Sequence, residues 1–141
     1  MELKYSALKR VITTTPDDKE SQASAESLVK WAQRIGAVLK SLGLSKSQIR
    51  NIFGTVRQID MSWPKQAVKD EEKAQIRLAA RQVLLLKPKL AYQAKRTETV
   101  SKLAGVLDPA LDMVGTSREY FENFLDFFEA ILAYHTAFGG K

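Results

Sequence analysis

From Ser24 onward, apolar residues recur every three or four positions, which is the period of an amphipathic α-helix. Gly43 follows the first such stretch, where a glycine suits the left-handed residue that ends a helix. The pattern therefore predicts a first helix over residues 24–42. Its apolar face carries Leu28, Trp31, Ala32, Ile35, Val38, Leu39 and Leu42.

A second helix is predicted to begin at once, because Ser45 and Gln48 form the capping-box pattern. Trp63-Pro64 is expected to end it. A third helix is predicted from Asp70 to Leu84, since three consecutive acids at its start suit the positive end of the helix dipole. The apolar stripe of the second helix is Ile49, Ile52, Phe53, Val56 and Ile59.

Two prolines are predicted to interrupt the remaining helical pattern. Pro88 lacks an amide hydrogen and pushes Lys87 away from the α region, which predicts a break or kink before a fourth helix. Asp108-Pro109 is predicted to close that helix, with residues 110–115 as a connection. A capping box at Thr116 and Glu119 then opens the last helix. Its apolar face carries Phe121, Phe124, Leu125, Phe128, Ile131, Leu132 and His135.

These segments predict an all-α protein, a compact bundle of about five helices that forms a single helical-bundle domain over residues 24–141. Residues 1–23 are predicted to be a flexible, loosely attached N-terminal lead, with a short helix or strand near Tyr5–Ile12. No segment of useful length alternates with period two. Strong helix formers surround the one apolar run, Val83–Leu86, that could in isolation be a buried strand.

The length of 141 residues fits one ordinary domain, and no apolar run approaches the roughly 20 residues that a membrane span needs. The absence of cysteine excludes disulfides and thiolate metal sites. The first ten residues, MELKYSALKR, lack the apolar core of a secretory signal. A cytoplasmic protein is therefore expected.

Charge is distributed unevenly along the chain. Residues 46–107 carry thirteen basic and five acidic side chains, whereas residues 108–141 carry two basic and six acidic ones. A basic surface supplies the sequence-independent part of nucleic-acid affinity. The basic middle of the chain is therefore the first place to look for a phosphate-binding surface.

Two basic stripes follow from helical spacing. Arg50, Gly54 and Arg57 share a flank of the second helix, which is either a phosphate-tracking surface or a solvated flank where the glycine allows close helix packing. The third helix carries the stripe Lys73, Arg77 and Arg81. We interpret that second stripe as a solvated face, because surface ion pairs with nearby acids contribute little stability.

The densest signal surrounds Pro88. Lys87 and Lys89 bracket the proline, Tyr92 and Arg96 lie one helical turn apart, and Lys95 adds a further charge. Proteins that bind single-stranded nucleic acids typically place an aromatic ring against a base or sugar, and neighbouring cations hold the phosphates. The alternative is that Tyr92 packs against an adjacent helix with its hydroxyl group at the edge.

Nothing in the sequence indicates catalysis. The last helix carries an acidic stripe opposite its aromatic face, and the phenylalanines are interpreted as core. His135 is the only histidine, has no companion at metal-ligand spacing, and is interpreted as a core-edge or surface residue. There is no phosphate-binding glycine loop, zinc-protease motif or nucleophile–base set. We therefore expect no enzyme, no cofactor and no metal site. The acidic stripe consists of Glu119, Glu122, Asp126 and Glu129.

Three segments together resemble a known family. They are QIRNIFGTVRQI at residues 48–59, LLLKPKLAYQAKR at residues 84–96, and a C-terminal FxxFLxFFEAILAYH helix. The chain resembles the small subunit of type III-A CRISPR effector complexes, the Csm complex, over about Ser45–Phe138. The most specific part is the pattern K-P-K-L-A-Y-x-x-x-R at Lys87–Arg96, and Ile49-Arg50 is the second anchor.

The resemblance implies a non-catalytic helical bundle whose copies stack alongside the backbone subunits that hold the CRISPR RNA (crRNA). It implies that basic surface lines the channel where target RNA pairs with this guide. The partners implied are crRNA and target RNA, further copies of the chain, the backbone subunit and the large polymerase-like subunit, with no membrane. Arg50, Tyr92 and Arg96 occupy motif positions. Charge and proximity add Arg57, Lys87, Lys89 and Lys95 to the RNA-binding candidates.

Two functional hypotheses follow. In the first, the chain is an RNA-binding structural subunit that reads backbone shape. In the second, it is purely a protein–protein scaffold, in which the Lys73–Arg77–Arg81 stripe pairs with the acidic stripe of the next copy. A kink at Pro88 further predicts that the isolated subunit forms a domain-swapped or simple homodimer.

Overall fold

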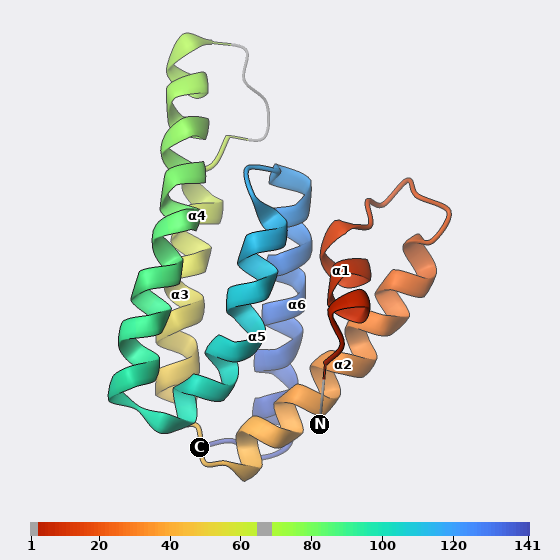
Figure 1. The fold of residues 1–141 in the computed structure, drawn as a ribbon, viewed down its shortest axis with the longest axis vertical. Helices are drawn as coiled ribbons and strands as arrows, with labels where there is room; N and C mark the ends of the chain where they lie inside the picture. The colour runs from red at the N-terminus through yellow and green to blue at the C-terminus, as the bar shows by residue number, and fades with distance from the viewer. Residues whose placement is uncertain (1–2, 65–68) are drawn as a thin grey trace.

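The computed structural model describes residues 3–64 and 69–141, and in that part of the chain it contains six helices and no strand. The all-α prediction is confirmed, whereas the helix count is six instead of about five. Figure 1 shows that the N-terminal turns of the fourth helix project beyond the ends of the fifth and sixth. In chain order the helices are α1 (Tyr5–Thr13), α2 (Ser21–Ser41), α3 (Lys46–Ser62), α4 (Asp70–Arg96), α5 (Glu98–Val114) and α6 (Arg118–Ala137).

The predicted ends of α2 and α3 are confirmed in detail. Gly43 has a φ of +84°, the left-handed conformation expected after α2. The side chain of Ser45 accepts a hydrogen bond from the Gln48 amide at 3.1 Å, and the Gln48 side chain accepts one from Ser45 at 3.2 Å, which completes the capping box. At α6 the cap is Ser117 instead of Thr116, since the Ser117 hydroxyl oxygen accepts from the Tyr120 amide.

Neither proline ends its helix, so the predicted break at Pro88 and the predicted end at Pro109 are wrong, whereas the alternative of a kink at Pro88 stays a prediction. α4 continues for 27 residues through Pro88, and α5 continues through Pro109. A proline inside a helix costs about 3 kcal/mol, but Leu86 and Leu90 are buried on either side of Pro88. Each fully buried leucine contributes about 1.5–3 kcal/mol, so tertiary packing outweighs the local penalty.

The turn that the sequence places at Pro88 lies instead at Thr97. This residue is extended, with φ −133° and ψ 109°, and it ends α4 and begins α5. α4 and α5 then run side by side within one chain (Figure 1). α4 is thus continuous at Pro88, as the domain-swap hypothesis requires, and any exchange of α5 between two chains would have to open at Thr97. The homodimer itself stays a prediction.

The N-terminal segment is anchored, so the prediction of a loosely attached lead is wrong for α1. This segment is helical, and its Leu8, Val11 and Ile12 side chains are buried. The Asn123 side-chain amide of α6 donates hydrogen bonds to the carbonyl oxygens of Ile12 and Thr14, each at 2.8 Å. Residues 1–2 of the predicted lead lie outside the described residues.

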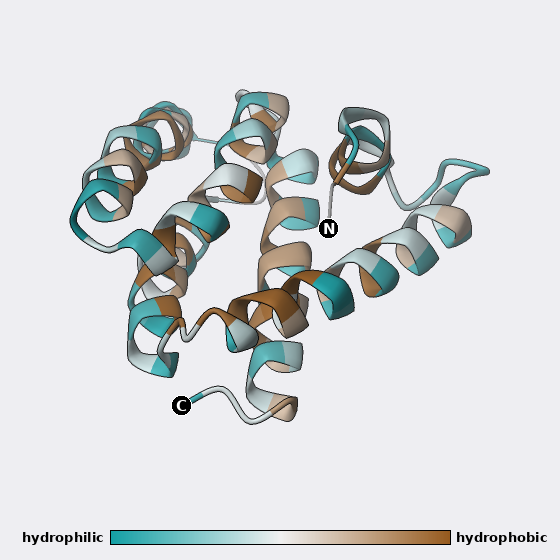
Figure 2. Cartoon of the chain, turned by 60° about the horizontal axis from the view of Figure 1, so that its bottom comes forward, coloured by the Kyte–Doolittle hydropathy of each residue, from teal (hydrophilic) through white to brown (hydrophobic). Residues whose placement is uncertain are grey.

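The core is built around α6, as its aromatic stripe predicts. Hydrophobic residues lie on the helix faces that look toward one another (Figure 2). Edge-to-face and tilted aromatic contacts join α6 to α3 and the turn after it: the ring centroids of Phe53 and Phe128 are 5.2 Å apart, and those of Trp63 and Phe121 are 5.1 Å apart. The fully buried phenylalanines are Phe121, Phe124, Phe127 and Phe128.

α2 and α6 approach each other closely at Gly36. A Cβ atom at this position would lie 2.8 Å from the Cβ of Tyr134 and 2.9 Å from the backbone nitrogen of His135. The side chain of His135 is fully buried, and its Nε2 atom lies 2.7 Å from the Leu44 carbonyl oxygen. His135 is thus a core residue that fixes the turn between α2 and α3.

We expect Gly36→Ala to destabilise the protein by about 1–3 kcal/mol, because the added methyl group meets backbone atoms of α6 and forces the two helices apart. Chemical denaturation followed by circular dichroism measures the loss. Gly54→Ala is the matched control, since a Cβ there meets nothing within 4 Å and alanine is the better helix former by roughly 0.5–1 kcal/mol. Equal stabilisation by both substitutions would contradict the close approach.

Candidate nucleic-acid interface

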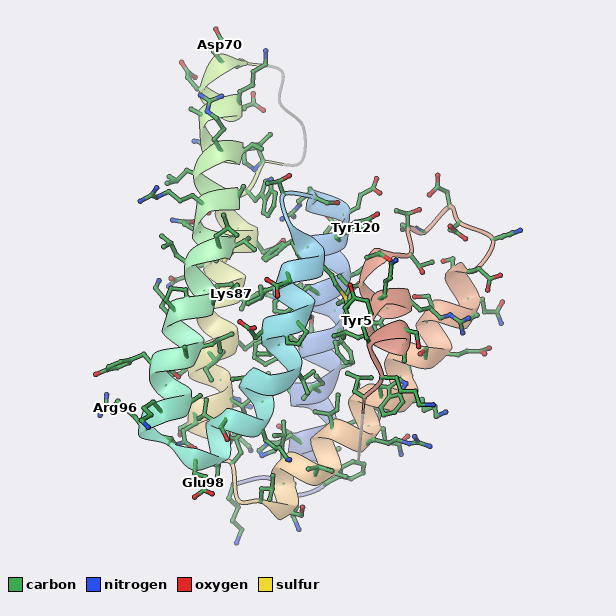
Figure 3. The ribbon with its side chains drawn as sticks, in the orientation of Figure 1. Tyr5, Asp70, Lys87, Arg96, Glu98 and Tyr120 are labelled. Atoms are coloured by element: carbon green, nitrogen blue, oxygen red, sulfur yellow. The ribbon has the colours of Figure 1, made fainter. Side chains whose placement is uncertain are left out.

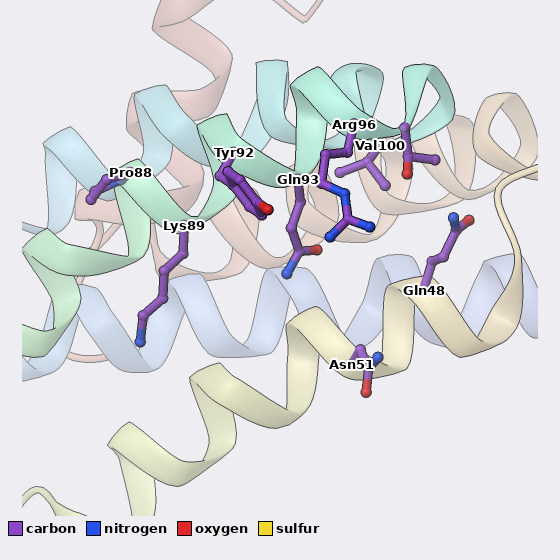
Figure 4. A pocket seen from close by; sticks show the side chains of 9 residues that line it. Gln48, Asn51, Pro88, Lys89, Tyr92, Gln93, Arg96 and Val100 are labelled. Carbon is purple, nitrogen blue, oxygen red and sulfur yellow. The ribbon is translucent and has the colours of Figure 1, made fainter.

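A groove of about 660 Å³ lies between α3 and α4, at the end where α4 turns into α5. Figure 4 shows its polar side chains, which come from both helices. The wall on α4 carries basic, aromatic and amide side chains, and the wall on α3 carries amides. The polar residues that line the groove are Gln48 and Asn51 from α3, and Lys89, Tyr92, Gln93 and Arg96 from α4.

Tyr92 stands at the lip of the groove and is not packed into the core. Its side chain is 62% exposed, so the alternative in which it packs against a neighbouring helix is wrong. The guanidinium carbon of Arg96 lies 5.6 Å from the centre of the Tyr92 ring, a cation–π distance. The helix places them together because residues four apart lie on the same face.

Three candidate cations near this end of α4 form no ion pair among the residues that the structure describes. Lys89, Lys95 and Arg96 are exposed, and within residues 3–64 and 69–141 none of them has a carboxylate within 4 Å. Lys89 and Arg96 line the groove, and Lys95 is the neighbour of Arg96 in the chain. This end of α4 therefore presents three unneutralised positive charges to solvent.

Lys87 is separated from this group. Its ammonium group is paired with two carboxylates of α5, 3.7 Å from Asp108 and in closer contact with Asp112 (Figure 3). The hydrogen bond to Asp112 is the main reason that the pKa of Lys87 is raised. Residues two positions apart in a helix differ by about 200° around its axis. Because α4 continues through Pro88, Lys87 and Lys89 therefore face different ways.

Arg50 and Arg57 form a second basic strip, on α3. Both are exposed, and Gly54 between them lies in open space, so the glycine does not serve close helix packing. Neither arginine lines the groove. Arg50 is two positions from the groove residue Gln48, which places it about 200° around the helix. The structure therefore divides the predicted cations between two surfaces.

The sequence pattern does not single out the three amides of the groove. It indicates Gln48 only as a capping residue and gives no signal at Asn51 or Gln93. Side-chain amides are common on helix surfaces, so the residue type alone does not indicate a binding site. Their convergence depends on how α3 crosses α4, which no local pattern records.

The acidic stripe lies on another part of the molecule. Glu119, Asp126 and Glu129 are exposed along α6. At the start of that helix the Arg118 guanidinium group bridges Asp60 at 2.7 Å and Glu122 at 3.3 Å, and it stacks on Trp63. Within the described ranges, the stripe is therefore paired only at Glu122.

Two further observations concern other classes of site. Among the residues that the structure describes, no group of three histidine or carboxylate side chains has the spacing to hold a metal ion. In the same ranges, no helix is both long and apolar enough to cross a membrane.

The fold and the groove define a small all-helical bundle with a cationic, amide-lined cleft. The family model described as Csm2 Type III-A matches residues 22–141, which is most of the chain. The chain therefore belongs to the Csm2 family, the small structural subunit of the multi-subunit type III-A CRISPR (Csm) complex. The match includes α2, which the sequence resemblance did not cover. No curated protein and no solved structure matches the chain.

The surroundings of Asp126 predict how the stability of the protein depends on pH. Partial burial, followed by the charges of Glu129, Glu122 and Asp60, raises the pKa of Asp126. A carboxyl group whose pKa is higher in the folded state destabilises that state while it is ionised. We expect Asp126→Asn to raise the melting temperature at pH 7, and we expect this gain to shrink as the pH falls through the raised pKa.

Thermal melts at pH 7 and at pH 4 measure this effect. Asp70→Asn is the control, because Asp70 lies in the first turn of α4, where the helix dipole favours a negative charge. The control should not gain stability at either pH. An Asp126→Asn variant with an unchanged melting temperature at pH 7 would contradict the raised pKa of Asp126 in the folded state.

Proposed function

We propose that the chain is the non-catalytic, RNA-binding small subunit of its Csm complex. In this proposal it contacts target RNA phosphates through the basic faces of α3 and α4, and copies of it stack along the backbone that carries the crRNA. The observation that carries the proposal is that Lys89, Lys95 and Arg96, on the same helix as an exposed tyrosine, have no ion pair within residues 3–64 and 69–141. Phosphate contacts of this kind release counterions and do not depend on sequence.

The two basic surfaces have different roles in this proposal. The groove side of α4 offers Lys89 and Arg96 to a single strand, with Tyr92 between them on the same helix. The strip formed by Arg50 and Arg57 on α3 extends the positive field along a neighbouring flank. Lys87 takes no part, because Asp108 and Asp112 already neutralise it.

A second candidate function is a scaffold between copies of the chain. It is favoured by α4, where Leu78, Leu84 and Leu85 are exposed on the helix that also carries the stripe Lys73–Arg77–Arg81. The acidic stripe of a neighbouring α6 complements that basic stripe in charge. Self-association that disappears at high salt, together with no RNA affinity at any salt concentration, would favour this scaffold.

Charge reversal tests the first proposal. We expect the double variant Arg50→Glu and Arg96→Glu to bind single-stranded RNA about tenfold more weakly, because two phosphate contacts are replaced by repulsion. The slope of log affinity against log salt should also flatten by about 1.4, since each contact to a single strand contributes about 0.7. Fluorescence anisotropy over a salt series measures both quantities.

The matched control reverses two exposed lysines away from both surfaces, Lys9→Glu and Lys19→Glu. It changes the net charge by the same amount and should alter affinity much less. If the Arg50 and Arg96 variant folds normally and binds RNA like the unaltered chain, these two arginines are not the contacts.

A further inference from the structure

The groove contains three side-chain amides that phosphate binding does not require. Within the described residues, the side chains of Asn51 and Gln93 make no hydrogen bond to the protein. Gln48 uses its oxygen to accept from the Ser45 amide at 3.2 Å, which fixes the side chain and leaves its NH₂ group available. These amides line one cleft and come from two helices (Figure 4).

The chemistry of an amide suits a nucleobase better than a phosphate. A phosphate offers only acceptors, whereas an amide presents a carbonyl acceptor and an NH₂ donor side by side. The edge of a base presents donors and acceptors in the same way, and asparagine and glutamine pair with such edges. The amides of Asn51 on α3 and Gln93 on α4 are thus complementary to the edge of an unpaired base.

Tyr92 and Arg96 provide the second element of a base site. The tyrosine ring is 62% exposed, and the guanidinium group lies 5.6 Å from its centre. Aromatic rings and guanidinium planes are the groups on which proteins stack unpaired bases. The stacking pair and the amides line the same groove of about 660 Å³, which is within the range of roughly 300–1,000 Å³ that holds small organic ligands.

We propose that the groove between α3 and α4 binds an unpaired nucleotide through its base. The base stacks on the Tyr92–Arg96 pair and meets the amides of Asn51 and Gln93 with its edge, while Lys89 holds a flanking phosphate. The inference rests on the proposed RNA binding and deepens it, because it names the unpaired base as a ligand. A base inside a duplex is paired and stacked, so it cannot enter the groove.

The test compares two fluorescently labelled RNA 12-mers with the full chain at low salt. One is intact, and the other has abasic nucleotides at its four central positions, so the two carry the same phosphates. Stacking contributes about 1–3 kcal/mol per base, so we expect the intact strand to bind at least about fivefold more tightly. This comparison requires no protein variant.

Variants then assign the difference to the groove. Tyr92→Ala, and separately the double variant Asn51→Ala with Gln93→Ala, should weaken binding of the intact strand and leave the abasic strand unchanged. Tyr5→Ala and Gln33→Ala are the matched controls, since Tyr5 is 68% exposed on α1 and Gln33 is exposed on α2. Both controls should keep the full preference for the intact strand.

The outcomes separate the two proposals. Equal affinity of the unaltered chain for the intact and abasic strands would overturn the base site and leave the phosphate-binding function standing. A preference for the intact strand that persists in the groove variants would place base recognition elsewhere and would also overturn it. No affinity for either strand at low salt would overturn the proposed function together with the base site.

Discussion

The close approach of α2 to α6 at Gly36 is the constraint on which the rest of the structure depends. No side chain separates the two helices at this point, because a Cβ would lie under 3 Å from the backbone of α6. The approach brings the His135 ring within hydrogen-bonding distance of the Leu44 carbonyl oxygen. Gly140 lies directly against the same ring, and the Lys46 amide donates to the Lys141 carbonyl oxygen at 2.8 Å. The start of α3 is thereby fixed to the C-terminal end of the chain.

This fixed start of α3 positions one wall of the candidate interface. Gln48 and Asn51 lie in the first two turns of α3, so their position depends on the turn that His135 fixes. The opposite wall depends on α4, which packs against α3 and α5. The groove therefore lies where two separately anchored helices meet, and its side chains can be arranged in advance of binding.

The uninterrupted course of α4 decides which charges are available. Because the helix continues through Pro88, Lys87 turns toward the carboxylates of α5, while Lys89 and Arg96 turn toward the groove. A break at the proline would have left no fixed angular relation between these side chains. The burial of Leu86 and Leu90 thus determines both the helix and the charge pattern on its surface.

By itself, the sequence determined the helical class, the capping of α3, the left-handed end of α2 and the aromatic core of α6. These features depend on neighbours within about four positions, which local spacing records. It also indicated the family through the segments at residues 48–59 and 84–96. Only the tertiary structure decided the passage through Pro88 and Pro109, the anchoring of α1 by Asn123, the neutralisation of Lys87 and the meeting of the amides with Tyr92. Each of these depends on contacts between residues far apart in the chain, where burial and ion pairing outweigh the local preference that a sequence pattern expresses.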